Sequence, residues 1–146
     1  PGDNFDEENA MVIPSLMARI KRGDDPVVVW GDGSAIRDFL YSKDAAEGII
    51  LALYWGTAGS YVNLASGKGH AISEVLKTLS TFIDFNYKFD KTKSSGFPKR
   101  VMDISKAKKL IHFKPSTPLS NGLKETWEWF LVNGKEYKKK KNYFKD

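Results

Sequence analysis

Apolar residues recur every three or four positions in several segments of the chain, which is the spacing of one face of an α-helix. The first such segment carries four of them, Ile13, Leu16, Met17 and Ile20, and Gly23 is suited to end it. The same spacing, with residues that favour helix ends, predicts helices over 42–55, 73–83, 105–111 and 120–133. The pattern therefore predicts about five helices.

Two of these predicted helices carry a well-defined apolar face. In the second helix the face consists of Ala46, Ile49, Ile50 and Leu53. In the last helix the residues predicted to point inward are Leu123, Trp127, Phe130 and Leu131. Gly134 is predicted to end that helix.

Short runs rich in β-branched and aromatic residues indicate strands between the helices. Residues 27–30 and 36–41 flank a turn-forming Asp32-Gly33, and we predict that they form a hairpin. Further strands are predicted at 61–64 and 87–89, and 91–100 is predicted to be a loop. Strands that alternate with helices place the chain in the α/β class, but about four short strands are too few for a complete doubly wound sheet. We therefore expect the chain to be part of a larger unit.

The positive charge of the chain is concentrated at its end. Residues 135–146 hold six Lys against one Glu and one Asp, which gives +4 of the net charge of +5. We therefore divide the chain into a globular part, 1–134, and a Lys-rich tail, 135–146. Such a tail is more typical of a solvated terminus than of a binding arm, so nucleic acid is not expected as a partner. The alternative is a non-catalytic module that binds a polyanionic partner through the tail.

Two further features of the composition narrow the function classes. No apolar run approaches the roughly 20 residues that a membrane span needs, so no membrane segment is predicted. The chain contains no cysteine, which excludes disulfides, thiolate nucleophiles and sulfur-ligated zinc. The expected compartment is the cytoplasm.

Motifs for cofactor binding and catalysis are incomplete in this chain. The glycine pairs at 31–33 and 67–69 lack the third glycine of a dinucleotide fingerprint. Tyr-x-x-x-Lys occurs at Tyr87/Lys91 on a predicted strand and at Tyr137/Lys141 in the tail, and neither setting suits a catalytic pair. We therefore predict no catalytic residue and no metal site.

Arginine is scarce, with four residues against nineteen lysines, so Arg37 and the pair Lys99-Arg100 stand out, as does Trp30. A planar guanidinium suits a bidentate grip on a diphosphate, and an aromatic ring can pack on a base or sugar. On the pattern alone, however, an ion pair of Arg37 with Asp38 or Asp44 and a half-buried Trp30 are favoured over a binding role.

Four longer segments resemble a known family. They are PGDNFDEENAMVIPSLMARI, VVVWGDGSAIRDFLYSKDAAEGI, YVNLASGKGHAISEVLKTL and FPKRVMDISKAKKLIHFKPSTPLSNGLKETWEWFL. Together they resemble the carboxy-terminal half of extended short-chain dehydrogenases that act on nucleotide sugars, nearest to the GDP-L-fucose synthase-like enzymes of the NAD-dependent epimerase/dehydratase family. The most specific part is the W-G-x-G-x-x-x-R-D-F segment that begins at Trp30.

The resemblance implies an α/β fold that forms the carboxy-terminal, substrate-binding part of an extended Rossmann-type enzyme. In that family the first half, a Rossmann domain, holds most of the NAD or NADP contacts and the catalytic Ser, Tyr and Lys. The resemblance thus implies that this chain is inactive alone and that the missing Rossmann half is a partner. A homodimer of the full-length enzyme is a further implied assembly.

The family positions that transfer to this chain concern the nucleotide-sugar site. Arg19, Trp30 and Arg37 match family positions that bind the nucleotide-diphosphate sugar. Lys99 and Arg100 fall in a family loop that approaches the substrate. The resemblance therefore implies these five residues as substrate-binding residues.

One position departs from the fucose synthases. They carry Asn-Ser-His before Val-Ile-Pro, and the histidine acts as an acid/base in epimerisation, whereas this chain carries Asn9-Ala10-Met11. A thioether cannot transfer a proton. Reductase, dehydratase and epimerase by another route all remain open for the full-length enzyme.

Overall fold

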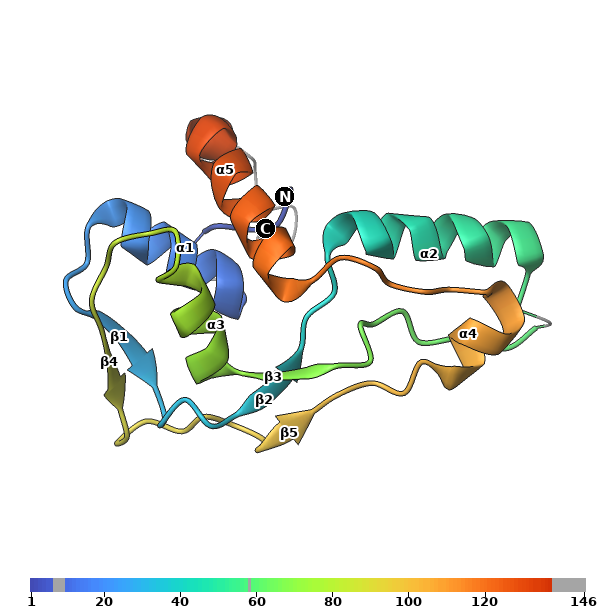
Figure 1. The fold of residues 1–146 in the computed structure, drawn as a ribbon, viewed down its shortest axis with the longest axis horizontal. Helices are drawn as coiled ribbons and strands as arrows, with labels where there is room; N and C mark the ends of the chain where they lie inside the picture. Colours follow the sequence, from blue (N-terminus) through green and yellow to red (C-terminus); the bar gives the residue numbers. More distant parts are fainter. Residues whose placement is uncertain (7–9, 58, 138–146) are drawn as a thin grey trace, which may run out of the picture.

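The computed structural model describes residues 1–6, 10–57 and 59–137, so most of the Lys-rich tail, 138–146, lies outside the described residues. The chain contains, in order, α1 (Val12–Arg22), β1 (Val27–Trp30), β2 (Ile36–Asp38), α2 (Ser42–Trp55), β3 (Gly69–Ala71), α3 (Ile72–Leu79), β4 (Tyr87–Asp90), β5 (Lys99–Arg100), α4 (Ser105–Ile111) and α5 (Leu119–Tyr137). All five predicted helices are present, and the α/β class is confirmed (Figure 1).

The strands pair differently from the prediction. β1 pairs in parallel with β4, from Val27 opposite Tyr87 to Trp30 opposite Asp90. β2 lies in a second sheet, antiparallel to β3 and parallel to β5. The predicted hairpin of 27–30 with 36–41 is therefore wrong. Gly31 and Gly33, with φ of 82° and 81°, direct the connection into the second sheet instead of folding it back on β1.

The shortest strands were also mispredicted. Residues 61–64 form no strand. β5 lies in the segment predicted to be a loop, and β3 lies in a segment for which no strand was predicted. These two strands have three and two residues, and both exist because β2 offers its two edges to them. Their existence depends on partners distant in sequence, so local propensity does not reveal them.

The main core joins the helices α1, α3 and α5 to the sheet of β1 and β4, and we name this part the main lobe. Its most buried side chains include Met17, Val27, Val75, Leu76 and Leu79, none of which is exposed to solvent. Figure 1 shows α1, α3 and α5 gathered on one side of the molecule.

The last helix runs past its predicted end. Gly134 is buried within α5. A Cβ there would lie 2.8 Å from the Phe130 ring and 2.9 Å from Lys21 Nζ. Lys21 in turn donates to the Phe130 carbonyl at 3.0 Å. Gly134 thus permits a close approach, and the prediction that it ends the helix is wrong. Leu131, predicted to point inward, is exposed.

A second, smaller core lies under α2 and α4, which extend away from the main lobe in Figure 1. We name this part, 42–68 and 105–113, the side lobe. Ala107, Ile111 and Phe113 are buried there, against half-buried side chains of α2 and of the segment after it. Gly48 brings α2 close, since a Cβ there would lie 2.8 Å from Leu64 and 3.0 Å from Phe113.

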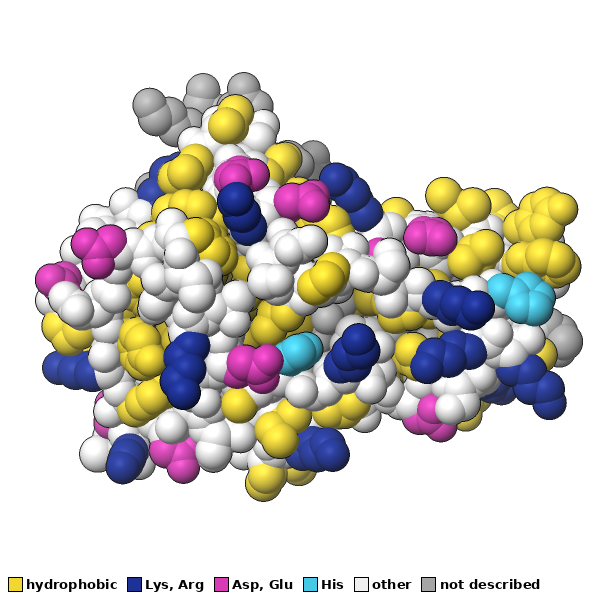
Figure 2. All heavy atoms as spheres, in the orientation of Figure 1, with side chains coloured by type: hydrophobic (Ala, Val, Ile, Leu, Met, Phe, Trp, Pro, Cys, Tyr) yellow, Lys and Arg dark blue, Asp and Glu magenta, His cyan; other side chains and the backbone are white. Residues whose placement is uncertain are grey.

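The apolar face predicted for α2 is present but has no partner within the described residues. The exposed fractions of Ile49, Ile50 and Leu53 are 62%, 66% and 86%. Figure 2 shows hydrophobic side chains gathered at this end of the molecule. Among the described helices, none is long and apolar enough to cross a membrane.

Candidate functional site

A cleft of about 560 Å³ opens in the main lobe between α1, β1, β2 and the loop that precedes β5. Three residues expected from the sequence, Arg19, Trp30 and Arg37, line this cleft together. They come from three different elements, and the fold brings them to one place. We call this cleft the arginine cleft.

The arginine cleft is shaped by a tight connection between β1 and β2. A Cβ on Gly33 would lie 2.4 Å from the Phe89 ring, and one on Gly31 would lie 2.6 Å from Ser95 Cβ. Both positions therefore require glycine, for space as well as for positive φ. Trp30, directly before this connection, is 66% exposed, so the half-buried placement favoured by the pattern is wrong.

Arg37 organises the opposite wall of the cleft. Its Nη1 donates to the carbonyl oxygens of Phe97 at 2.7 Å and Ile36 at 2.8 Å, and its Nη2 donates to that of Ser95 at 2.9 Å. These bonds hold the 94–97 loop and leave two of the five guanidinium N–H groups for other partners.

The ion pair favoured for Arg37 on the residue pattern does not form. The Asp38 carboxylate instead accepts hydrogen bonds from the backbone N–H groups of Ser66 and Gly67, at 2.8 and 3.0 Å. Asp44 accepts from the backbone and the hydroxyl of Thr117, at 3.0 Å each. Both carboxylates therefore join chain segments, and neither lines the arginine cleft.

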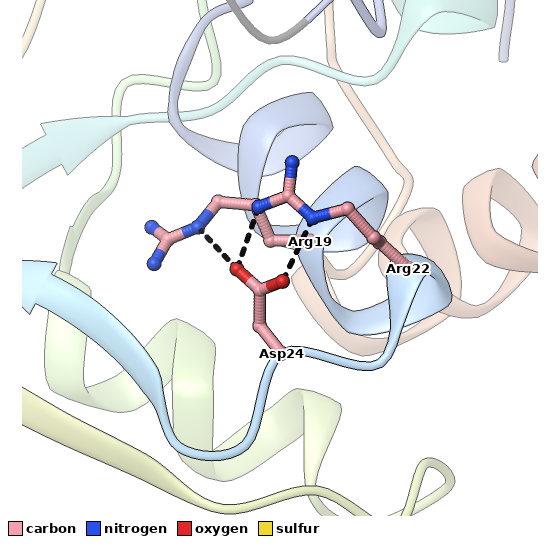
Figure 3. A network of polar contacts seen from close by, with 3 residues as sticks. All are labelled: Arg19, Arg22 and Asp24. Atoms are coloured by element: carbon pink, nitrogen blue, oxygen red, sulfur yellow. Dashed lines mark hydrogen bonds and ion pairs between the residues drawn. The ribbon is translucent and has the colours of Figure 1, made fainter.

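Arg19 approaches the cleft from α1 and is held by one carboxylate. Its Nε lies 3.3 Å from Asp24 Oδ2, while Arg22 contacts the same carboxylate through Nε and Nη2 at 2.8 and 2.7 Å (Figure 3). The hydrogen bond from Arg22 lowers the pKa of Asp24 below its ordinary value, and the bond from Arg19 acts in the same direction. Asp24 therefore stays ionised near neutral pH.

A second cleft of about 700 Å³ lies between the amino-terminal segment, the start of α1 and the start of α5. Arg37 lines this cleft too, together with Met11, Tyr41 and Arg100. Lys99 lines neither cleft. Arg100 also packs its guanidinium 4.5 Å from the centre of the Phe97 ring. Of the five expected residues, the structure thus gathers three in the arginine cleft and places Arg100 beside them in the second.

Tyr41 in the second cleft was not singled out from the sequence. Its hydroxyl donates to Glu125 Oε2 at 2.7 Å, and Glu125 also pairs with Lys43 at 3.1 Å. Burial, and then the bond to Glu125, raise the pKa of Tyr41 to about 12. Glu125 follows Tyr41 by 84 positions, so no local spacing signals this pair. Among the side chains described within 1–6, 10–57 and 59–134, no three from His, Asp or Glu are grouped as metal ligands would be.

The sequence was compared with protein families and with known proteins, and the matches are to related enzymes. Residues 1–65 match the sequence profile of the NAD dependent epimerase/dehydratase family. GDP-L-fucose synthase 1 of Arabidopsis thaliana is 37% identical over 139 residues, which cover 91% of this chain and 43% of that protein. The chain thus spans less than half the length of this relative.

Solved structures resemble the chain over a similar extent. A GDP-L-fucose synthetase from Naegleria fowleri bound to NADP superposes with a TM-score of 0.79 and 32% identity, over 92% of this chain and 44% of that one. The UDP-glucose 4-epimerase of Thermotoga maritima with UDP-glucose gives 0.74 and 28%, over 91% and 43%. Residues 1–65 therefore match the NAD dependent epimerase/dehydratase family, and the chain as a whole is similar to the carboxy-terminal part of longer Rossmann-type enzymes.

Proposed function

We propose that this chain is the nucleotide-sugar-binding half of an NAD(P)-dependent nucleotide-sugar epimerase or reductase, with the nucleotide diphosphate in the arginine cleft. The observation that carries the proposal is the convergence of Arg19, Trp30 and Arg37 on one cleft from three separate elements. Its volume of about 560 Å³ lies within the range of small-molecule sites, roughly 300–1,000 Å³.

The chemistry of the cleft suits a nucleoside diphosphate. Arg19 and Arg37 retain N–H donors that no described residue engages, and guanidinium groups bind phosphate oxygens in pairs. The exposed Trp30 ring offers an apolar face for a base or sugar. The UDP-glucose in the Thermotoga maritima relative supports the same class of ligand.

We further propose that the remainder of the full-length enzyme supplies the catalytic group and most contacts to NAD or NADP, so that this chain is inactive alone. The relatives are more than twice as long as the matched region, and the Naegleria fowleri relative binds NADP. The exposed face of α2, Ile49, Ile50 and Leu53, is the surface on which we expect that missing Rossmann half to dock. Dimerisation is proposed only for the full-length enzyme.

The proposal is tested by calorimetric titration of the chain with GDP and UDP. We expect binding that Arg19→Ala weakens at least fivefold, because the guanidinium provides charge-assisted hydrogen bonds to phosphate, worth about 1–3 kcal/mol. Deleting 135–146 should leave the affinity within about twofold, since a terminal tail distant in sequence from the cleft residues adds little at physiological salt. Loss of all phosphate binding on that deletion, with no effect of Arg19→Ala, would instead support a module that binds polyanions through its tail.

The reaction of the full-length enzyme should differ from that of a fucose synthase. Met11 is exposed at the second cleft, where a thioether can neither give nor take a proton. A positioned acid/base contributes about 100- to 10,000-fold in rate, so double epimerisation of GDP-4-keto-6-deoxymannose should be slow. Deuterium entry beside the keto group, followed by NMR in deuterated water, measures this. Rapid exchange at both flanking carbons would contradict the prediction, whereas faster exchange after Met11→His would place the side chain at the sugar.

A further inference from the structure

The end of α1 brings a carboxylate back against the helix that carries Arg19. Gly23 adopts a left-handed conformation with φ of 93°, which ends the helix. The N–H of Asp24 then donates to the Arg19 carbonyl at 3.1 Å, so the backbone of Asp24 is tied to the last turn. This places the Asp24 side chain beside the stem of Arg19 and not out in solvent.

Asp24 engages only one corner of the Arg19 guanidinium. The contact is made by Nε, at 3.3 Å, and Figure 3 shows the two terminal nitrogens pointing away from the carboxylate. These terminal nitrogens have no hydrogen-bond partner among the residues that the structure describes. Because a guanidinium is planar, fixing Nε also fixes the direction of the terminal pair.

We propose that Asp24 is a positioning residue for nucleotide binding, which holds Arg19 so that its terminal nitrogens meet the diphosphate as a pair. The inference rests on the proposed function, since it assumes that the arginine cleft takes a nucleoside diphosphate. Asp24 itself contacts no ligand. Arg22 anchors the carboxylate through two bonds, so Asp24 is fixed in turn. The ligand then meets an arginine whose rotamer freedom has already been restricted.

The sign of the effect distinguishes positioning from simple electrostatics. Asp24 is a negative charge close to a site for an anion, so by Coulomb's law alone its removal should strengthen diphosphate binding. Its removal also takes a negative charge away from Arg22, which acts in the same direction. If Asp24 positions Arg19, removal should weaken binding in spite of both effects.

The test is titration of the chain with GDP and with UDP after Asp24→Asn, a substitution that keeps the side-chain shape. We expect the affinity to fall about fivefold, the effect of about 1 kcal/mol. Asp25→Asn is the matched control, because it removes the same charge one position later. The Asp25 carboxylate accepts from Asn86 Nδ2 at 3.0 Å and contacts no arginine that the structure describes. Asp25→Asn should leave affinity unchanged or slightly higher.

A double-mutant cycle shows whether Asp24 acts through Arg19. In an Arg19→Ala background, Asp24→Asn should change the affinity by less than about twofold, because the group being positioned is gone. A full further loss in that background would overturn the inference and assign Asp24 a general structural role. Unchanged or tighter binding after Asp24→Asn alone would also overturn it, while a loss caused by Arg19→Ala would leave the proposed function standing. Absence of GDP and UDP binding by the native chain would overturn both.

A measurement without ligand provides an independent readout. In the native chain the Nε–H resonance of Arg19 should be distinct and slowly exchanging, because it is held by a carboxylate. After Asp24→Asn it should move to the position of free arginine side chains, while the backbone amide spectrum stays close to native. An unmoved Nε–H resonance would contradict the positioning role whatever the titrations give.

Discussion

The two lobes differ in how far they bury the apolar side chains of a helix. In the main lobe, α3 buries Val75, Leu76 and Leu79 completely between α5 and the sheets. In the side lobe, α2 also carries an apolar face, yet Ile50 and Leu53 lie open to solvent. Helical spacing of apolar residues thus predicts an apolar face, but it does not predict whether this chain buries that face. The open face supports our proposal that a further part of the enzyme covers α2.

The largest expected difference between the lobes is in folding stability. Leu76→Ala in the main lobe should lower the free energy of unfolding by about 2–5 kcal/mol, because Leu76 is 0% exposed and a cavity would remain. The identical change at Leu53, which is 86% exposed, should cost less than about 0.5 kcal/mol. Urea unfolding of the chain measures both. Equal costs would mean that α2 is buried in solution and that the contrast between the lobes is wrong.

The second prediction concerns the stability cost of Leu53→Ala in the full-length enzyme. If the missing half covers α2, the substitution should there cost about 2 kcal/mol or more, as a buried leucine does. Lys43→Ala, on the same helix but in an exposed ion pair with Glu125, serves as control and should cost under about 1 kcal/mol in both forms. A cost for Leu53→Ala that stays negligible in the full-length enzyme would remove the docking proposal.

The third prediction concerns the arginine cleft, which lies between α1 and β1 of the main lobe and the adjoining strand β2. Arg37→Lys should weaken GDP and UDP binding by about 1–3 kcal/mol, because an ammonium cannot reproduce the fork that holds Phe97 and Ser95. Lys99→Ala is the control, since Lys99 lies on the adjacent strand but lines neither cleft. Calorimetric titration of both variants measures their affinities for GDP and UDP. Equal losses of affinity would show that general positive charge, and not the Arg37 guanidinium, binds the ligand.

The smallest expected effect is a pH dependence of folding stability that comes from Tyr41, where the two lobes join. The pKa of Tyr41, about 12, lies above its ordinary value of 10.0, so the folded state holds this proton more tightly than the unfolded state. Its contribution to stability should be complete below pH 10 and lost as the pH rises towards 12. Tyr41→Phe should remove this dependence, so its stability should fall less steeply than native between those values. The prediction would be wrong if the free energies of unfolding of the native chain and of Tyr41→Phe fell in parallel between pH 10 and 12.

Sequence reasoning succeeded where structure is local. The end of α1 at Gly23 and the bounds of α2 and α4 were predicted correctly, because the residues that signal them lie within a few positions of each other. It failed for the hairpin, since β1 takes β4 as its partner some sixty residues away. It also failed for Gly134, because Lys21 approaches this position from another helix.

In the candidate site, too, the features that local sequence signals differ from those that depend on distant residues. The resemblance named Arg19, Trp30 and Arg37, and the structure places all three on one cleft, but their use as ligand-binding residues stays a prediction. The sequence missed Asp24, although a carboxylate directly after a helix-ending glycine and five positions after an arginine was the available signal. The bonds of Arg37 to the 94–97 loop had no such signal, because they span about sixty positions.

The sequence by itself indicated the five helices, the α/β class and the resemblance to a known family, because each depends on residue order over short distances. The tertiary structure alone decided which strands pair, which apolar faces are buried and where each arginine donates its hydrogen bonds. Strand pairing and burial depend on partners far apart in the chain, and backbone groups carry no side-chain pattern that marks a partner in advance. The apolar face of α2 stays exposed within the described residues, and its burial by the missing half stays a proposal.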